Sequence, residues 1–149
     1  MSSLNKQPWG GFHPASAPDY LPADRLRRLQ LQRLKHMVQR AYDRVELFHR
    51  RMEERCLTPD SIQALDDIRR LPFTVKADLR DTYPFGLFAS PMEDIVRLHA
   101  SSGTTGKPIV VAYTRADIEV WASVMQRTFL SCGLHAGDII HNAYGYGLF

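Results

Sequence analysis

Two apolar runs, at residues 95–100 and 109–114, most strongly constrain the fold of this chain. Both are rich in β-branched residues, and the stretch between them reads Ser-Ser-Gly-Thr-Thr-Gly-Lys-Pro over 101–108. Apolar runs of this length bounded by glycine and proline are typical of strands. The sequence therefore predicts two strands joined by a loop. The second run is apolar at nearly every position, which predicts burial on both of its faces.

The chemistry of the loop suits phosphate groups. Gly103 and Gly106 permit positive φ and a close approach of the backbone, so that successive N–H groups can form an anion-binding concavity. Lys107 adds a positive charge. Hydroxyl groups come from Ser101, Ser102, Thr104 and Thr105. Ordinary turns use the same small polar residues, so the composition by itself leaves a solvent-exposed turn equally open.

The two common nucleotide motifs do not fit this loop. A P-loop has four residues between its first glycine and the Gly-Lys pair, whereas two separate Gly103 from Gly106. Pro108 follows the lysine, has no backbone N–H, and leads into a strand rather than a helix. The dinucleotide fingerprint Gly-x-Gly-x-x-Gly is absent as well.

Three segments are expected along the chain. Residues 1–20 are rich in proline, glycine and serine and predict an extended lead-in. Residues 21–92 predict a helical subdomain with Pro22 in its first turn, a break near Val45, and short helices before Pro72 and after Thr74. Residues 93–149 predict the start of an α/β domain.

Within that last segment a helix should follow the second strand. Thr114 and Asp117 have capping-box spacing, and apolar residues then recur at helical intervals. Gly133 should end the helix in a left-handed conformation, and a turn at Gly137 should lead into a strand starting at Ile139. The predicted fold class is α/β: helices, a β-hairpin, a helix and a strand, with the fold incomplete at residue 149.

Composition sets the broad class of the protein. The 149 residues carry a formal net charge of only +3, and the excess of basic residues lies in 22–55, with ten Lys/Arg against five Asp/Glu. A solvated helix face is the expected role of such a charge run, so we expect no nucleic-acid partner.

Cys56 and Cys132 have no metal-ligand spacing, and no metal site is expected. Because the sequence shows neither an apolar leader nor an apolar run of membrane-spanning length, we expect a cytoplasmic protein with no membrane partner.

The string at 101–108 resembles the phosphate loop of the AMP-forming adenylating enzymes. Residues 71–88, 97–108 and 142–149 resemble the corresponding segments of the phenylacetate–CoA ligase family. A looser match covers 40–51, where the family has a Ser-Pro-Phe-Tyr-like break and this chain has Val45 to His49. The resemblance extends from about residue 22 to the end of the chain.

The resemblance implies a ligase that joins a carboxylic acid to coenzyme A through an acyl-adenylate, with consumption of Mg-ATP. It places the ATP phosphates on Ser101, Ser102, Gly103, Thr104, Thr105, Gly106 and Lys107. It places an aromatic acid, phenylacetate, against Tyr144, Gly145 and Phe149. ATP, Mg²⁺ and coenzyme A are the expected cofactors of the complete enzyme, which the resemblance allows to be a homodimer.

The same resemblance implies that much of the enzyme lies outside these residues. The family's C-terminal catalytic lysine has no counterpart, so no catalytic residue is assigned, and His99 and His141 are expected to be structural. We expect this N-terminal fragment to be inactive alone. The alternatives are another adenylating enzyme, either an aryl acid–CoA ligase or a coenzyme F420 adenylyltransferase-like protein, and a non-catalytic nucleotide- or anion-binding module.

Overall fold

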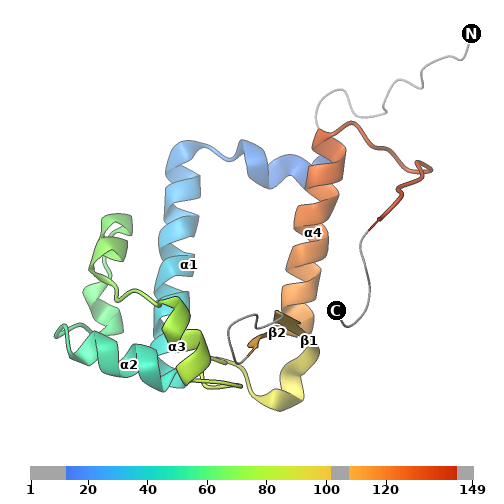
Figure 1. The fold of residues 1–149 in the computed structure, drawn as a ribbon. Helices are drawn as coiled ribbons and strands as arrows, with labels where there is room; N and C mark the ends of the chain where they lie inside the picture. Colours follow the sequence, from blue (N-terminus) through green and yellow to red (C-terminus); the bar gives the residue numbers. More distant parts are fainter. Residues whose placement is uncertain (1–12, 102–107, 144–149) are drawn as a thin grey trace, which may run out of the picture.

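A computed structural model describes residues 13–101 and 108–143 of the chain. Helices dominate, and one two-stranded antiparallel sheet lies between the helical segment and the last helix (Figure 1). The α-helices and strands are α1 (Ala23–Arg44), α2 (Glu46–Glu53), α3 (Lys76–Asp81), β1 (Ile95–Ser101), β2 (Ile109–Thr114) and α4 (Arg115–Ser131). The 3₁₀ turns are η1 (Pro14–Tyr20), η2 (Pro59–Ser61), η3 (Leu65–Arg70) and η4 (Met92–Asp94).

The predicted helical segment is confirmed, including its break. Val45 separates α1 from α2 with an extended backbone conformation, φ −118° and ψ 100°. A β-branched residue loses side-chain freedom in a helix, which makes this a favourable place to interrupt a run of good helix formers. Pro22 precedes the first helical residue and is the N-cap of α1. The break turns α2 across the end of α1 (Figure 1).

The hydrophobic core lies entirely in this helical segment as far as the described residues go. It consists of Val38, Met52, Leu57 and Ile62, and Met52 and Ile62 are fully buried. Partly buried side chains pack around it from α1, α2 and the segment before α3: Leu34, Tyr42, Phe48 and Leu71. This core fixes α1, α2 and the 57–71 segment to one another.

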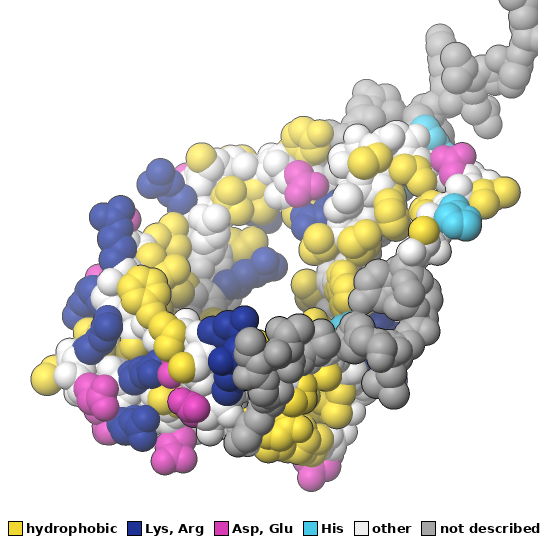
Figure 2. Space-filling model, in the orientation of Figure 1, with side chains coloured by type: hydrophobic (Ala, Val, Ile, Leu, Met, Phe, Trp, Pro, Cys, Tyr) yellow, Lys and Arg dark blue, Asp and Glu magenta, His cyan; other side chains and the backbone are white. Residues whose placement is uncertain are grey.

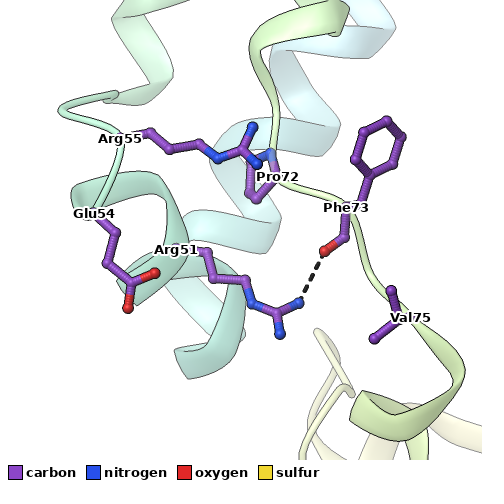
Figure 3. Close-up of a pocket in the computed structure, with 6 residues that line it drawn as sticks. All are labelled: Arg51, Glu54, Arg55, Pro72, Phe73 and Val75. Atoms are coloured by element: carbon purple, nitrogen blue, oxygen red, sulfur yellow. Dashed lines mark hydrogen bonds between the residues drawn. The ribbon is translucent and has the colours of Figure 1, made fainter.

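An ion pair ties the next segment to the core. The Arg51 guanidinium binds both carboxylate oxygens of Asp78, at 2.6 and 2.7 Å, and also donates to the carbonyl oxygen of Phe73 at 2.8 Å (Figure 3). Asp78 is buried and accepts from the backbone N–H of Val75 at 2.7 Å as well. The short helix expected after Thr74 is therefore α3, and its N-cap is Val75, whose N–H binds the Asp78 side chain at the third helical position.

The hairpin and the helix that follows it form as predicted. β1 and β2 pair antiparallel, with His99 opposite Val111 and Ser101 opposite Ile109. Thr114 caps α4: its N–H and hydroxyl both donate to the Asp117 carboxylate, at 2.8 and 2.7 Å. Gly133 has the expected positive φ, at +82°, and Gly137, in the expected turn, has a φ of +96°.

Three expectations are wrong. Of the expected extended lead-in at 1–20, residues 14–20 form the 3₁₀ helix η1, with the His13 ring accepting from the N–H of Ala15, and residues 1–12 lie outside the described residues. β2 is only half-buried, and Val111 is 44% exposed, because no strand other than β1 pairs with it in the described chain. Residues 139–143 are not a strand, and Ile139 is 97% exposed. An isolated strand has no partners for its backbone groups, so its residues adopt no regular structure.

Two sets of contacts join η1 and α1 to later parts of the chain. At one end, η1 packs against α4, and Arg127 binds the Asp19 carboxylate at 2.8 Å. At the other end, Arg40 of α1 donates to the Ala89 carbonyl and the Ser90 hydroxyl, just before the hairpin. Between these contacts the space-filling view shows an opening between α1 and α4 (Figure 2).

No helix in the described ranges is long and apolar enough to span a membrane.

The core predicts the outcome of a matched pair of methionine substitutions. Met52→Ala should lower the free energy of unfolding by about 2–5 kcal/mol, because it leaves a cavity in a fully buried site. Met37→Ala on α1 removes a side chain that is 61% exposed and should change it by less than about 0.5 kcal/mol. Urea titrations followed by circular dichroism measure both, and equal effects would contradict the assigned core.

The Arg51–Asp78 pair predicts a pH dependence. Hydrogen bonds from Arg51 and from the Val75 N–H lower the pKa of Asp78 below its usual value. When folding lowers the pKa of a carboxyl group, its ionised form stabilises the folded protein at pH values above the pKa of the unfolded chain, near 4. That stabilisation is lost as the pH falls through the pKa of the folded protein. Asp78→Asn should therefore destabilise the protein at pH 7, and the difference from wild type should shrink below about pH 4.

Urea midpoints between pH 2.5 and pH 7 measure this difference. Asp66→Asn is the matched control, because the Asp66 side chain is 90% exposed and its contact with Arg69 is 3.9 Å long. The urea midpoint of that variant should match the wild-type midpoint at every pH. A constant difference between Asp78→Asn and wild type across the range would count against the ion pair as the source.

Candidate functional site

The hairpin brings the two ends of the predicted phosphate loop together. Ser101 is the last residue of β1 and lies opposite Ile109, the first residue of β2. The N–H of Ile109 approaches the Ser101 hydroxyl oxygen at 3.4 Å, and Ser101 is exposed. A paired ladder thus anchors both stems, and the residues between them must begin and end within one strand spacing.

Most of the predicted site residues lie outside the described residues. These are Ser102, Gly103, Thr104, Thr105, Gly106 and Lys107 of the loop, and Tyr144, Gly145 and Phe149 of the predicted acid pocket. Ser101 is the predicted site residue that the structure describes. The roles predicted for all of them therefore remain predictions, and the structure defines the frame that carries the loop.

Three aromatic rings join the hairpin to α4. The His99 ring centroid lies 5.0 Å from that of Tyr113 and 5.9 Å from that of Trp121, both in edge-to-face geometry. Tyr113 and Trp121 are 5.4 Å apart. His99 pairs with Val111, so Tyr113 is its diagonal neighbour on the same face of the sheet. His99 packs against rings, as expected of a structural histidine.

A second contact fixes the angle between β2 and α4. Asp117 accepts from the hydroxyl and from the N–H of Thr114, and these two hydrogen bonds lower the pKa of its carboxyl, with a smaller contribution from the positive charge of Arg40. The carboxylate therefore stays ionised at neutral pH and holds the first turn of α4 onto the end of β2. The hairpin and α4 therefore form one connected unit.

An open pocket of about 250 Å³ lies beside this unit, between α3, the 87–90 segment and β2. Its wall is mostly apolar, and Ser90, Thr114 and Asp117 supply the polar groups. The apolar lining residues are Leu79, Leu87, Phe88, Ala89, Ile95, Val110, Val111 and Ala112. Sequence patterns give no sign of this pocket, because its residues come from α3, the 87–90 segment, both strands and α4, which only tertiary packing brings together.

A second open pocket, of about 230 Å³, lies where α2 meets the segment before α3 (Figure 3). Arg51, Glu54 and Arg55 line one side, and Pro72, Phe73 and Val75 line the other. Both guanidiniums are engaged within the chain, since Arg51 binds Asp78 and Arg55 donates to the carbonyls of residues 70 and 71 at 3.1 Å. This pocket is explained by the packing of the segment and not by a ligand.

Several arginines of the basic segment at residues 22–55 are likewise engaged by other groups of this chain. Arg40, Arg51 and Arg55 all bind acceptors of this chain. Arg28 and Arg50 pair with carboxylates one helical turn away. Among residues 13–101 and 108–143, no three His, Cys, Asp or Glu side chains gather in a way that could hold a metal ion.

Comparison with known proteins finds close relatives. No protein-family model matches the chain. The chain is 52% identical over 129 residues to the phenylacetate-coenzyme A ligase of Thermus thermophilus, and 51% identical over 126 residues to that of Escherichia coli. These matches take in 87% and 85% of the chain. The chain is thus similar to an N-terminal portion of phenylacetate–CoA ligases. It spans 29% of the length of these relatives.

Solved structures agree with this assignment. A 2-hydroxyisobutyryl-CoA ligase in complex with 2-HIB-AMP and CoA, in the thioesterification state, superposes with a TM-score of 0.73 at 31% identity. An open conformation of that ligase gives 0.71 at 29% identity. Each match covers 79% of this chain, and 26% and 28% of the respective neighbour. The fold is therefore part of that of an adenylate-forming CoA ligase, which confirms the α/β expectation.

The aromatic cluster predicts how firmly the loop stems are held. Trp121→Ala removes two ring contacts, each worth about 0.5–1.5 kcal/mol beyond burial. Hydrogen exchange of the β1 and β2 amides should then become roughly two- to tenfold faster per lost contact. Trp121→Phe keeps an aromatic ring and should retain most of the protection. Unchanged exchange in Trp121→Ala would show that the hairpin does not depend on α4.

Proposed function

We propose that this chain contributes the ATP-phosphate loop of an AMP-forming acid–CoA ligase whose acid is phenylacetate. The observation that carries the proposal is identity of 51–52% to phenylacetate-coenzyme A ligases over 85–87% of the chain, a stretch that includes the hairpin and its loop. In that reaction the acid's carboxylate attacks the α-phosphorus of ATP, releasing pyrophosphate, and the thiol of coenzyme A then displaces AMP.

The loop is suited to the first of these steps. Ser101 through Lys107 would surround the β- and γ-phosphates with backbone N–H groups, hydroxyls and one ammonium group. Negative charge accumulates on the departing pyrophosphate, and donors that are already in position stabilise it at low reorganisation cost. The paired stems, held on α4 by the ring cluster and by Thr114 and Asp117, supply that positioning.

Residues Tyr144, Gly145 and Phe149 are proposed to line the acid site. Flat aromatic faces suit an aromatic acid, and glycine leaves room for a ligand beside the backbone. The relatives named for phenylacetate are 51–52% identical to this chain, whereas the ligase named for 2-hydroxyisobutyrate is 28–31% identical. This difference favours the aromatic acid over the small hydroxy acid.

The remaining ligands of the reaction are proposed for the complete enzyme. ATP and coenzyme A are its substrates, and the neighbouring ligase is named for complexes with an acyl-AMP and CoA. Mg²⁺ belongs to the ATP that such enzymes use. The described residues form no cluster of carboxylates suited to it, so its protein ligands are proposed to come from the rest of the enzyme. The similarity to these ligases also supports a division of the chain, which we propose, into a helical subdomain at 21–92 and a nucleotide-binding part from 93 onward.

A chimera tests the proposed role of the loop. This chain replaces the matched portion of the Thermus thermophilus relative, and phenylacetate-dependent exchange of pyrophosphate into ATP is measured. Lys107→Ala should slow the exchange about 10- to 150-fold, the equivalent of one lost charge-assisted hydrogen bond of about 1.5–3 kcal/mol.

Lys76→Ala is the matched control, because it removes the same charge from an exposed position on α3. That variant should exchange pyrophosphate at the unsubstituted rate. Equal rates for Lys107→Ala and the control would remove the loop from the mechanism. A chimera that forms adenylate with other acids but not with phenylacetate would keep the loop and reject the substrate.

A further inference from the structure

The base of the hairpin is the end opposite the loop, where Ile95 pairs with Thr114. The ladder is irregular there, because its register shifts between Ile95 and Arg97. Such an irregularity leaves a residue unpaired and weakens the ladder locally. An open pocket of about 250 Å³ adjoins the base, with Ile95, Thr114 and Asp117 in its wall. Side-chain packing therefore holds the base less firmly than it holds the helical core.

Arg40 joins α1 to both chain segments at this base. Its Nε donates to the Ala89 carbonyl at 3.3 Å, and a terminal guanidinium nitrogen donates to the Ser90 hydroxyl. These acceptors lie shortly before β1. At the end of β2, the Asp117 carboxylate accepts two hydrogen bonds from Thr114, which lower its pKa, and the positive charge of Arg40 lowers it further. One side chain thus acts on the chain entering β1 and on the chain leaving β2.

The backbone of Arg40 belongs to the firmly packed half of the chain. Arg40 comes two positions after Val38, which is a buried member of the hydrophobic core. The planar guanidinium directs several N–H donors along fixed directions, whereas lysine carries one compact ammonium group. An arginine at this position therefore links the core to two acceptors at once and keeps a positive charge near the Asp117 carboxylate.

We propose that Arg40 is a positioning residue for the phosphate loop, because it fixes the base of the hairpin that carries the loop stems. The inference rests on the proposed function of the loop. Strands of six and seven residues are about 20 Å long, so a tilt of about 5° at the base moves the stems by about 2 Å. A misplacement of about 1 Å at a reacting site can slow a reaction about a hundredfold.

Hydrogen exchange of the 149-residue chain tests the contact without any ligand. Arg40→Met should speed exchange of the amides at 97–101 and 109–114 roughly two- to tenfold, and leave the amides at 48–62 in the core unchanged. Arg40→Lys keeps the charge and one donor, so it should retain part of the protection. Unchanged exchange in the hairpin of Arg40→Met would overturn the proposal, and so would equal acceleration in the core.

Arg33→Met is the matched control, because it removes the same charge from an exposed position two turns earlier on α1. Its hairpin amides should exchange as in wild type. An acceleration equal to that of Arg40→Met would assign the effect to the charge of α1 in general and would overturn the specific role of Arg40.

The chimera described above tests the consequence for the reaction. Arg40→Met should slow phenylacetate-dependent exchange of pyrophosphate about tenfold, Arg40→Lys should slow it less, and Arg33→Met should leave it unchanged. The double variant of Arg40→Met and Lys107→Ala should lose less than the product of the two single losses, since a displaced loop has already lost much of what Lys107 contributes. A merely destabilised protein would show two independent factors that multiply, and that result would overturn the proposal.

The two proposals fail in different ways. If Lys107→Ala slows the exchange of pyrophosphate and Arg40→Met does not, the positioning role of Arg40 is wrong and the proposed function stands. If Lys107→Ala has no effect, the proposed function is wrong, and the positioning role falls with it even where Arg40→Met loosens the hairpin.

Discussion

The antiparallel ladder between β1 and β2 is the interaction on which the functional part of this protein depends. It places Ser101 opposite Ile109 and so fixes where the proposed phosphate loop begins and ends. The ladder is too short to be stable by itself, because an isolated two-stranded hairpin is marginal in water. It needs a surface to lie on, and α4 provides it through the ring of Trp121 and the cap formed by Thr114 and Asp117.

The two halves of the described chain are stabilised by different means. The helical half has its own core around Met52 and Ile62, and the Arg51–Asp78 pair, in which the carboxylate is buried, fixes the N-terminus of α3 to α2. An ion pair with a buried carboxylate is costly to break from the arginine side, since the remaining charge would be left without a partner. The hairpin half has ring contacts and hydrogen bonds but no buried side chain in the described strands and α4. Its apolar residues are therefore available for a further layer of protein.

This division bears on the proposed role of the loop in binding ATP. A phosphate loop must keep its stems fixed while its donors follow the charge that moves onto pyrophosphate. Stems built on a ladder and a capped helix would meet the first requirement, and the two glycines in the loop sequence favour the second. The helix α4 contacts the stems on one side and leaves large apolar side chains exposed elsewhere on its surface.

Local patterns in the sequence determined the elements near the loop. Spacing predicted the hairpin, the cap at Thr114, the left-handed Gly133 and the break at Val45, because each depends on residues within a few positions. The string at 101–108 indicated the family through residue types alone. The expected strand at 139 and the expected burial of β2 failed, because both depend on neighbouring strands and not on local sequence.

Tertiary structure decided what lies next to what. Only packing brought Arg51 to Asp78, Arg40 to Ser90 and Trp121 to His99, across 27, 50 and 22 positions of the chain. Contacts at such separations leave no periodic signal, since they depend on how helices and strands cross rather than on spacing along one of them. The sequence by itself determined the residue types of the loop and predicted its chemistry. The fold decided how the loop is held and which face of α4 is left open, because burial is a property of the assembled chain.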